Sequence, residues 1–114
     1  MKALFSSKKI IFLLFLLFSA SSVTAQINSK MANDLAKQNG CIACHHAKRK
    51  LVGPAYQNIS KRYSADSQAE KTLMDSVKLG VRGKYGFVPM PPHPRLSDVD
   101  NRILIKWILQ GAPE

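Results

Sequence analysis

The sequence has 114 residues and a formal net charge of +10, from 17 basic and seven acidic side chains. This length fits a single domain, and a positive charge of this size would suit nucleic acid as a partner. The basic residues form no long tract, however, and the N-terminal segment directs the chain to export, so nucleic-acid binding is excluded.

Residues 1–25 have the three-part pattern of a secretory signal peptide. Lysines precede an apolar run at residues 10–18, and Val23-Thr24-Ala25 ends the segment with small residues typical of a cleavage site. The run of nine residues is much shorter than the roughly 20 needed to span a bilayer, which favours cleavage over a retained anchor. We therefore predict a periplasmic protein whose mature domain is residues 26–114.

Removal of the leader takes away three basic and no acidic residues, leaving 89 residues with a net charge of +7 and five aromatic side chains. A chain of this size has a thin hydrophobic core and gains stability from a covalent staple. The mature sequence therefore favours a fold built around a bound group.

A first helix is expected between Asn28 and Gly40. Asn28 or Ser29 can cap its start, and Gly40 lies where helices often turn left-handed. Met31 and Leu35 are four positions apart and share one face. We expect Met31 to be a core or surface side chain.

The five residues Cys41-Ile42-Ala43-Cys44-His45 form the attachment pattern for c-type haem. Two thiols separated by two residues can reach the two vinyl groups on one edge of a porphyrin, and the next residue directs an imidazole at the iron. The sequence thus predicts one covalently bound haem c, attached to Cys41 and Cys44, with His45 as an iron ligand. This porphyrin would supply both the apolar area and the cross-link that the small mature domain needs.

Three other interpretations of the cysteines are less favoured. A thioredoxin-like dithiol would follow a strand in an alternating strand–helix pattern, which is not visible here. A zinc site needs about four ligands, and only His46 and His93 remain to complete one. A disulfide between Cys41 and Cys44 would close too small a loop to stabilise the chain much.

The next segment, Leu51-Val52-Gly53-Pro54, returns the backbone towards the haem motif. We predict that the Pro54 carbonyl accepts a hydrogen bond from the outer N–H of the ligand histidine, which fixes the tautomer. Pro54 could also begin a helix, and the two roles are compatible. Tyr56, Ile59 and Tyr63 share one face of the short helix that follows.

A further helix is predicted from the capping box Ser67-Gln68-Ala69-Glu70 to Gly80. Its apolar residues recur every four positions, at Ala69, Leu73 and Val77. Met74 lies off this stripe and is expected to serve packing.

Residues 81–96 are predicted to be a loop, because their glycines and prolines suit neither a helix interior nor a central strand. An apolar Met90 between Pro89 and Pro91 makes sense if its thioether points inward to a metal, so we predict Met90 as the second iron ligand. His93 is the competing ligand, but it lies between prolines and is expected to be exposed. After this loop, Ser97 should cap a last helix that ends at Gly111.

These segments resemble the small bacterial class I cytochromes c, the short periplasmic proteins with one haem. The resemblance is carried by Cys41-Ile42-Ala43-Cys44-His45, Leu51-Val52-Gly53-Pro54-Ala55-Tyr56, Val88-Pro89-Met90-Pro91-Pro92 and Lys106-Trp107-Ile108-Leu109. It implies an all-α fold of four to five short helices around one covalent haem, with the first and last helices crossing. It also implies His45/Met90 ligation of the iron.

Two segments depart from the family. Tyr85-Gly86-Phe87 stands where close relatives often carry Trp-Gly-Pro, and Leu79 stands where they often carry Asn. These departures put in question a polar hydrogen bond near the ligating sulfur. They bear on the value of the reduction potential, and the expected fold is unaffected.

The predicted function is periplasmic one-electron transfer rather than enzyme catalysis, because His45 and Met90 would close both axial positions of the iron. The alternative is a haem c enzyme or gas-binding sensor with a labile distal ligand. The expected partners are redox proteins with acidic docking surfaces, with transient contact to an anionic membrane surface as a further option. The basic residues that flank the haem-wrapping segments are Lys48, Arg49, Lys50, Arg82, Lys84 and Arg95.

Overall fold

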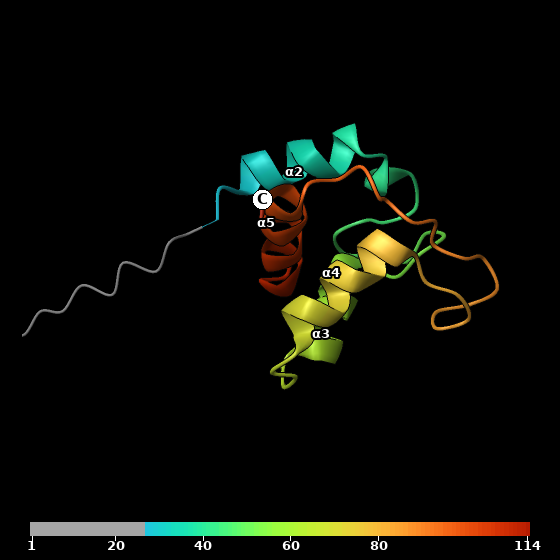
Figure 1. Cartoon of the computed structure of the whole chain (residues 1–114). Helices are drawn as coiled ribbons and strands as arrows, with labels where there is room; N and C mark the ends of the chain where they lie inside the picture. The colour runs from blue at the N-terminus through green and yellow to red at the C-terminus, as the bar shows by residue number, and fades with distance from the viewer. Residues whose placement is uncertain (1–26) are drawn as a thin grey trace, which may run out of the picture.

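A computed structural model describes residues 27–114 (Figure 1). Its elements are α2 (Ser29–Gln38), the 3-10 turn η1 (Cys41–Ala43), α3 (Tyr56–Tyr63), α4 (Ala69–Leu79) and α5 (Asp98–Leu109). The described part of the chain has no β-strand beyond two isolated antiparallel bridges, so the all-α prediction is confirmed. The predicted signal peptide lies outside the described residues. Within residues 27–114, no helix has the length and apolar character needed to cross a membrane.

Helix α5 is the element on which the other helices pack. It contacts α2, α3 and α4, and α2 lies across one end of it (Figure 1). The crossing with α2 is made from Ala32 and Ala36, which are fully buried, and small side chains of this kind let two helices approach closely. The predicted crossing of the first and last helices is therefore present. The buried face of α5 carries Asn101, Leu104, Ile105, Trp107 and Ile108.

Hydrogen bonds from buried or half-buried side chains fix α5 in position. Ser60 of α3 donates to the Leu109 carbonyl at 2.7 Å, and the amide of Asn101 donates to the Met74 carbonyl of α4 at 3.0 Å. Each bond gives a partner to a backbone carbonyl in a partly buried position, where water is less available as a donor. Helix α5 is thus tied to both neighbours by polar contacts as well as by apolar packing.

The predicted ends of the first and last helices are confirmed. The Asn28 side chain accepts from the Met31 amide, and Ser97 accepts from the Asp100 amide at the start of α5. Gly40 has φ 73°, in the left-handed region that glycine enters at little cost.

The predicted capping box at the start of α4 is wrong. Helix α4 begins at Ala69, and its N-cap Gln68 makes no side-chain capping bond. Instead, the carboxylate of Asp66 accepts from the Gln68 amide at 2.8 Å. Because the helix begins two residues after Ser67, Glu70 falls too early in the first turn to complete the box.

Met31 lies at the surface, one of the two positions expected for it, and Val99 of α5 is exposed as well. Met31 is 50% exposed and Val99 is 69% exposed, whereas Ala32 and Ala36 form the buried stripe of α2. The physical reason is the close crossing with α5, where a methionine would keep the two helices apart. The buried face predicted for α3, of Tyr56, Ile59 and Tyr63, is confirmed.

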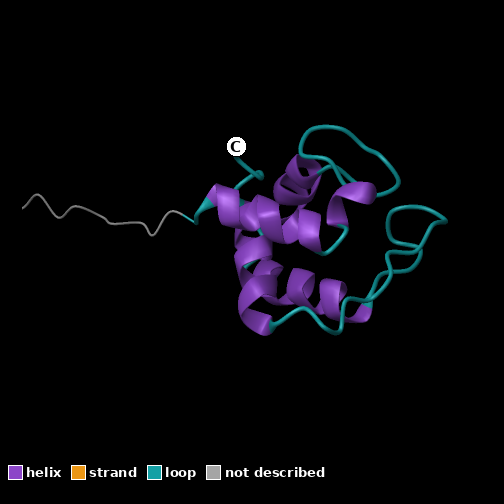
Figure 2. Ribbon diagram, turned by 90° about the horizontal axis from the view of Figure 1, so that it is seen from above, coloured by secondary structure: helices purple, strands orange, loops and turns teal. Residues whose placement is uncertain are grey.

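Two long connections extend from the same side of the helical body. One joins η1 to α3 and the other joins α4 to α5 (Figures 1 and 2). Together with Cys41 of η1, they carry the residues predicted for the cofactor site.

Candidate functional site

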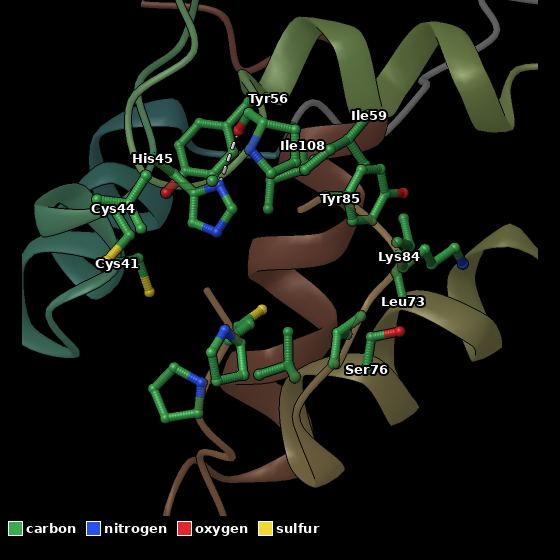
Figure 3. A pocket seen from close by; sticks show the side chains of 18 of the residues that line it. Cys41, Cys44, His45, Tyr56, Ile59, Leu73, Ser76, Lys84, Tyr85 and Ile108 are labelled. Carbon is green, nitrogen blue, oxygen red and sulfur yellow. Dashed lines mark hydrogen bonds between the residues drawn. The ribbon is translucent and has the colours of Figure 1, made fainter. Parts of the chain in front are cut away.

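The haem motif is placed by a tight turn directly after α2. The left-handed Gly40 ends the helix, and the amides of Cys44 and His45 both donate to the Cys41 carbonyl, at 3.2 and 2.9 Å. The turn gathers the two thiols and the imidazole on one side of a cavity (Figure 3). Burial raises the pKa of the Cys41 thiol.

The imidazole of His45 is held from behind by backbone. Its Nδ1 lies 2.8 Å from the Pro54 carbonyl oxygen, which can only accept, so Nδ1 carries the proton. The ring therefore presents the unprotonated Nε2 to the cavity (Figure 3), as metal ligation requires. This is the hydrogen bond that the sequence predicted for Pro54. Helix α3 begins only at Tyr56, so Pro54 does not start it.

Two neighbours leave the imidazole little freedom to rotate. A Cβ added at Gly53 would lie 2.5 Å from Cε1 of His45, so only glycine fits against the ring. On the other side, the Tyr56 ring stacks on the imidazole, with centroids 5.4 Å apart and planes inclined by 19°. Trp107 of α5 then meets Tyr56 edge-on at 5.4 Å, which links the histidine to the hydrophobic core.

The second wall of the cavity comes from the α4–α5 connection. Val81 and Met90 exchange two backbone hydrogen bonds, of 3.0 and 2.9 Å, and so close the loop of residues 82–89. Gly80 has φ 78°, and a Cβ there would lie 2.7 Å from the Met90 carbonyl oxygen, so the close approach of these two backbone segments requires glycine. Met90 is half-buried and lines the cavity, and it belongs to no helix.

His93 lines the same cavity and is half-buried, so the expectation that it would be exposed is wrong. Its amide donates to the Val77 carbonyl at 2.9 Å, which draws the segment against α4. The flanking prolines indicated an irregular segment, but they carried no information about this contact with a helix 16 residues earlier.

The cavity is large and mostly apolar. Its empty volume is about 1270 Å³, which includes space open to solvent. Helices α3, α4 and α5 supply its apolar floor through Ile59, Leu73, Val77, Leu104, Ile105 and Ile108. Such a cavity suits a bulky, flat apolar group.

One part of the cavity lining is cationic and aromatic. Lys84 donates a hydrogen bond to the Tyr63 hydroxyl, and its ammonium lies 5.1 Å from the Tyr63 ring centroid and 5.8 Å from that of Tyr85. The Arg62 guanidinium lies 5.0 Å from the Tyr85 centroid. These are cation–π distances.

The pKa values of the two phenols shift in opposite directions. Burial acts to raise the pKa of Tyr63, but hydrogen bonding to Lys84 and the charges of Lys84 and Arg62 outweigh it, so the net pKa is lowered. Burial raises the pKa of Tyr85 to about 12, and the neighbouring Tyr63 adds to this rise. Sequence patterns did not bring these residues together, because Tyr63 belongs to α3 and lies 21 positions before Lys84 in the loop.

The residues present fit haem. The side chains of Tyr56 and Tyr85 line the cavity, and their hydroxyls are buried with no hydrogen-bond partner among residues 27–114, a costly state that a polar group of a bound ligand would relieve. Haem combines a flat apolar ring with two carboxylates that can accept from such hydroxyls and from Lys84. The thiols, the imidazole and the thioether of Met90 are the donors that attach and ligate it in proteins.

Comparison with known proteins points to the same cofactor. The family model named Cytochrome c matches residues 29–112. Cytochrome c-552 of Nitrosomonas europaea is 40% identical over 92 residues, which cover 81% of this chain and 89% of that protein. Cytochrome c-552 of Hydrogenobacter thermophilus is 45% identical over 75 residues, covering 66% and 76%. The crystal structure of wild-type Nitrosomonas europaea cytochrome c552 superposes with a TM-score of 0.66 at 44% identity, covering 68% of this chain and 96% of that one.

The contact between Gly53 and the imidazole gives a testable prediction. Gly53→Ala should displace the His45 ring because the backbone at Gly53 accepts an alanine but the space beside Cε1 does not. We expect the haem-loaded protein to lose roughly 1–3 kcal/mol in unfolding free energy, and the Nδ1–H resonance of His45 to shift in the reduced protein. Guanidinium unfolding and proton NMR measure the two effects.

Gly83→Ala is the matched control, because Gly83 has φ 69° and open space around its Cα. It should cost stability through backbone strain and leave the His45 resonance in place. An unmoved His45 resonance in Gly53→Ala would show that the contact does not position the ring.

Proposed function

The chain belongs to the cytochrome c family, and on this premise we propose that it is a periplasmic one-electron carrier whose haem iron is ligated by His45 and Met90. Proteins of this family carry one covalently attached haem c and transfer electrons, so haem c with its iron is the cofactor of this chain. We further propose that Cys41 and Cys44 form the thioether attachments, that Pro54 orients His45, and that the chain catalyses no reaction of its own.

One observation carries this proposal. The His45 imidazole and the Met90 side chain line a single apolar cavity from two different connections of the chain. When bound, haem supplies a couple that gains or loses one electron at its iron. If protein atoms occupy both axial positions, no substrate can bind there, and electron transfer is the function that remains.

The residues of the chain tune and protect this couple. The Pro54 carbonyl fixes the His45 tautomer and makes Nε2 more basic. A methionine ligand raises the potential relative to other ligands. The apolar floor from α3, α4 and α5 excludes water, so little solvent has to reorganise when the charge of the iron changes.

The charge distribution supports acidic redox proteins as partners. Residues 35–65 and 76–97 contain no acidic side chain, and these stretches include both connections that border the cavity. Among the described residues, Arg49, Lys50, Arg82, Lys84 and Arg95 have no carboxylate within 4.0 Å. A field of this sign steers acidic surfaces towards the cavity. An anionic membrane surface would be attracted by the same charges.

The thioether attachments have a direct test. If Cys41 and Cys44 both bind haem covalently, acid–acetone treatment of the denatured mature protein should leave its absorbance with the polypeptide. Cys41→Ala should retain haem through one bond, and the double variant Cys41→Ala/Cys44→Ala should lose it to the acetone phase. Complete extraction of haem from the unaltered protein would disprove the attachment.

The axial ligand is tested by exchanging the two candidates. Met90→Ala should abolish the weak far-red sulfur-to-iron absorption of the oxidised protein, lower the potential and allow carbon monoxide to bind the reduced iron. His93→Ala should leave the absorption and the carbon monoxide response unchanged. The opposite pattern would assign the ligand to His93. Carbon monoxide binding by the unaltered protein would favour the alternative function of an enzyme or gas sensor.

Steering by charge predicts a dependence on salt. The rate of electron transfer to an acidic blue-copper protein should fall by roughly tenfold between about 0.01 and 0.1 M salt. Arg82→Glu with Arg95→Glu should flatten this dependence. The control is Lys106→Glu with Lys37→Glu, because Lys106 lies on the face of α5 opposite the cavity-lining Leu104 and Ile108. A rate that rises with salt would rule out an acidic docking surface.

A further inference from the structure

The loop of residues 82–89 has little structure of its own. Val81 and Met90 pair at its two ends through two backbone hydrogen bonds, but no residue between them makes a backbone hydrogen bond within the described chain. Seven of the eight loop residues are exposed, and Tyr85 alone among them is half-buried. The loop extends away from the helices (Figure 2), so its position depends on the side chains that hold it.

Lys84 makes the one side-chain hydrogen bond that joins this loop to the rest of residues 27–114. Its ammonium donates to the hydroxyl of Tyr63, a buried residue at the last position of α3. The bond therefore fastens the loop to a helix that ends about 20 residues earlier in the chain. A hydrogen bond from a charged donor is stronger than one between neutral groups.

Two cation–π contacts accompany this bond, and they run in opposite directions. The Lys84 ammonium of the loop lies 5.1 Å from the ring centroid of Tyr63 on α3. The Arg62 guanidinium of α3 lies 5.0 Å from the ring centroid of Tyr85 on the loop. Each element thus gives one cation to an aromatic ring of the other. We call these four residues the loop clasp, and a movement of the loop away from α3 would break its contacts together.

The loop clasp lies on the cavity that Met90 lines. Tyr63, Lys84 and Tyr85 also line that cavity, and Figure 3 shows Lys84 and Tyr85 on the side away from the two cysteines. If the loop left α3, water would enter the cavity along this side. The chain before Met90 would then be fixed only by its two backbone bonds to Val81.

We propose that the loop clasp positions Met90: by fastening the loop to α3, it keeps the methionine directed into the cavity and limits how often the second axial position of the haem iron opens. The inference rests on the proposed His45/Met90 ligation and deepens it by assigning the residues that keep the methionine in place. Lys84 and Tyr63 are thus positioning residues, which act on the iron through Met90. An ammonium has three donors, so Lys84 can bind Tyr63 and a haem carboxylate at once.

Cyanide binding to the oxidised haem protein measures this opening, because cyanide reaches the iron only when Met90 leaves it. Lys84→Met removes the donor and keeps the length of the side chain, and Tyr63→Phe removes only the acceptor hydroxyl. Each variant should bind cyanide about tenfold faster, as expected for the loss of a hydrogen bond to a charged group. Lys84→Arg should restore part of the slow rate.

A double variant separates the clasp from other roles of Lys84. If Lys84 and Tyr63 act through their mutual hydrogen bond, Lys84→Met/Tyr63→Phe should bind cyanide no faster than Lys84→Met alone. Rates that multiply in the double variant would overturn the inference, because the two side chains would then act independently.

Ser60→Ala is the matched control. The Ser60 hydroxyl also starts from α3, but it donates to the Leu109 carbonyl of α5 and does not contact the loop. Its loss should lower the free energy of unfolding and leave the cyanide rate unchanged. Hydrogen exchange of the Val81 and Met90 amides, followed by NMR, should become faster in Lys84→Met and Tyr63→Phe and stay unchanged in Ser60→Ala.

Two further outcomes would overturn the inference. One is an unchanged cyanide rate in both single variants, and the other is faster binding in Lys84→Met alone, which would show that Lys84 acts on another group such as a haem carboxylate. The far-red sulfur-to-iron absorption of the unaltered protein checks the proposed ligation separately. If this absorption is absent, the proposed ligation is wrong; if it is present while the clasp variants bind cyanide at the unaltered rate, only the clasp inference is wrong.

Discussion

The hydrogen bond from the His45 imidazole to the Pro54 carbonyl is the interaction on which the site depends. It determines which nitrogen faces the cavity and holds the η1–α3 connection against the haem motif. Gly53 makes the short approach feasible, and the stacked Tyr56 joins the imidazole to Trp107 and the core. A single backbone acceptor therefore couples the orientation of the His45 imidazole, the proposed iron ligand, to the packing of the last helix. Loss of packing at α5 would reach the ligand through two aromatic rings.

The opposite wall is built on a different principle. Met90 belongs to no helix, and its position comes from two backbone hydrogen bonds to Val81 and from a glycine at residue 80. The prolines around Met90 limit its backbone to a few conformations, so little entropy remains to be lost when the loop orders. The site thus combines a histidine whose ring is held directly by its neighbours with a methionine that is positioned through its own backbone.

The sequence predicted those features that depend on neighbouring residues. The haem motif, the Pro54 acceptor, the caps at Asn28 and Ser97 and the buried face of α3 follow from spacings of a few positions. The features it missed involve distant segments. The burial of His93 depends on Val77, and the contact of Lys84 with Tyr63 joins positions 21 apart. The buried stripe of Ala32 and Ala36 on α2 was not predicted either, because periodicity records hydrophobicity and not the distance between two helix axes.

The close crossing of α2 and α5 joins the two ends of the mature chain. Helix α2 finds its buried partner only in residues 98–109, so the fold cannot be completed until nearly the whole described chain is available for packing. Contacts between such distant segments form late because loop closure must come first. Cys41 and Cys44 follow α2 directly and therefore remain in an incompletely folded segment during this interval. If Cys41 and Cys44 attach haem as proposed, this topology leaves both thiols open to modification until the last helix docks.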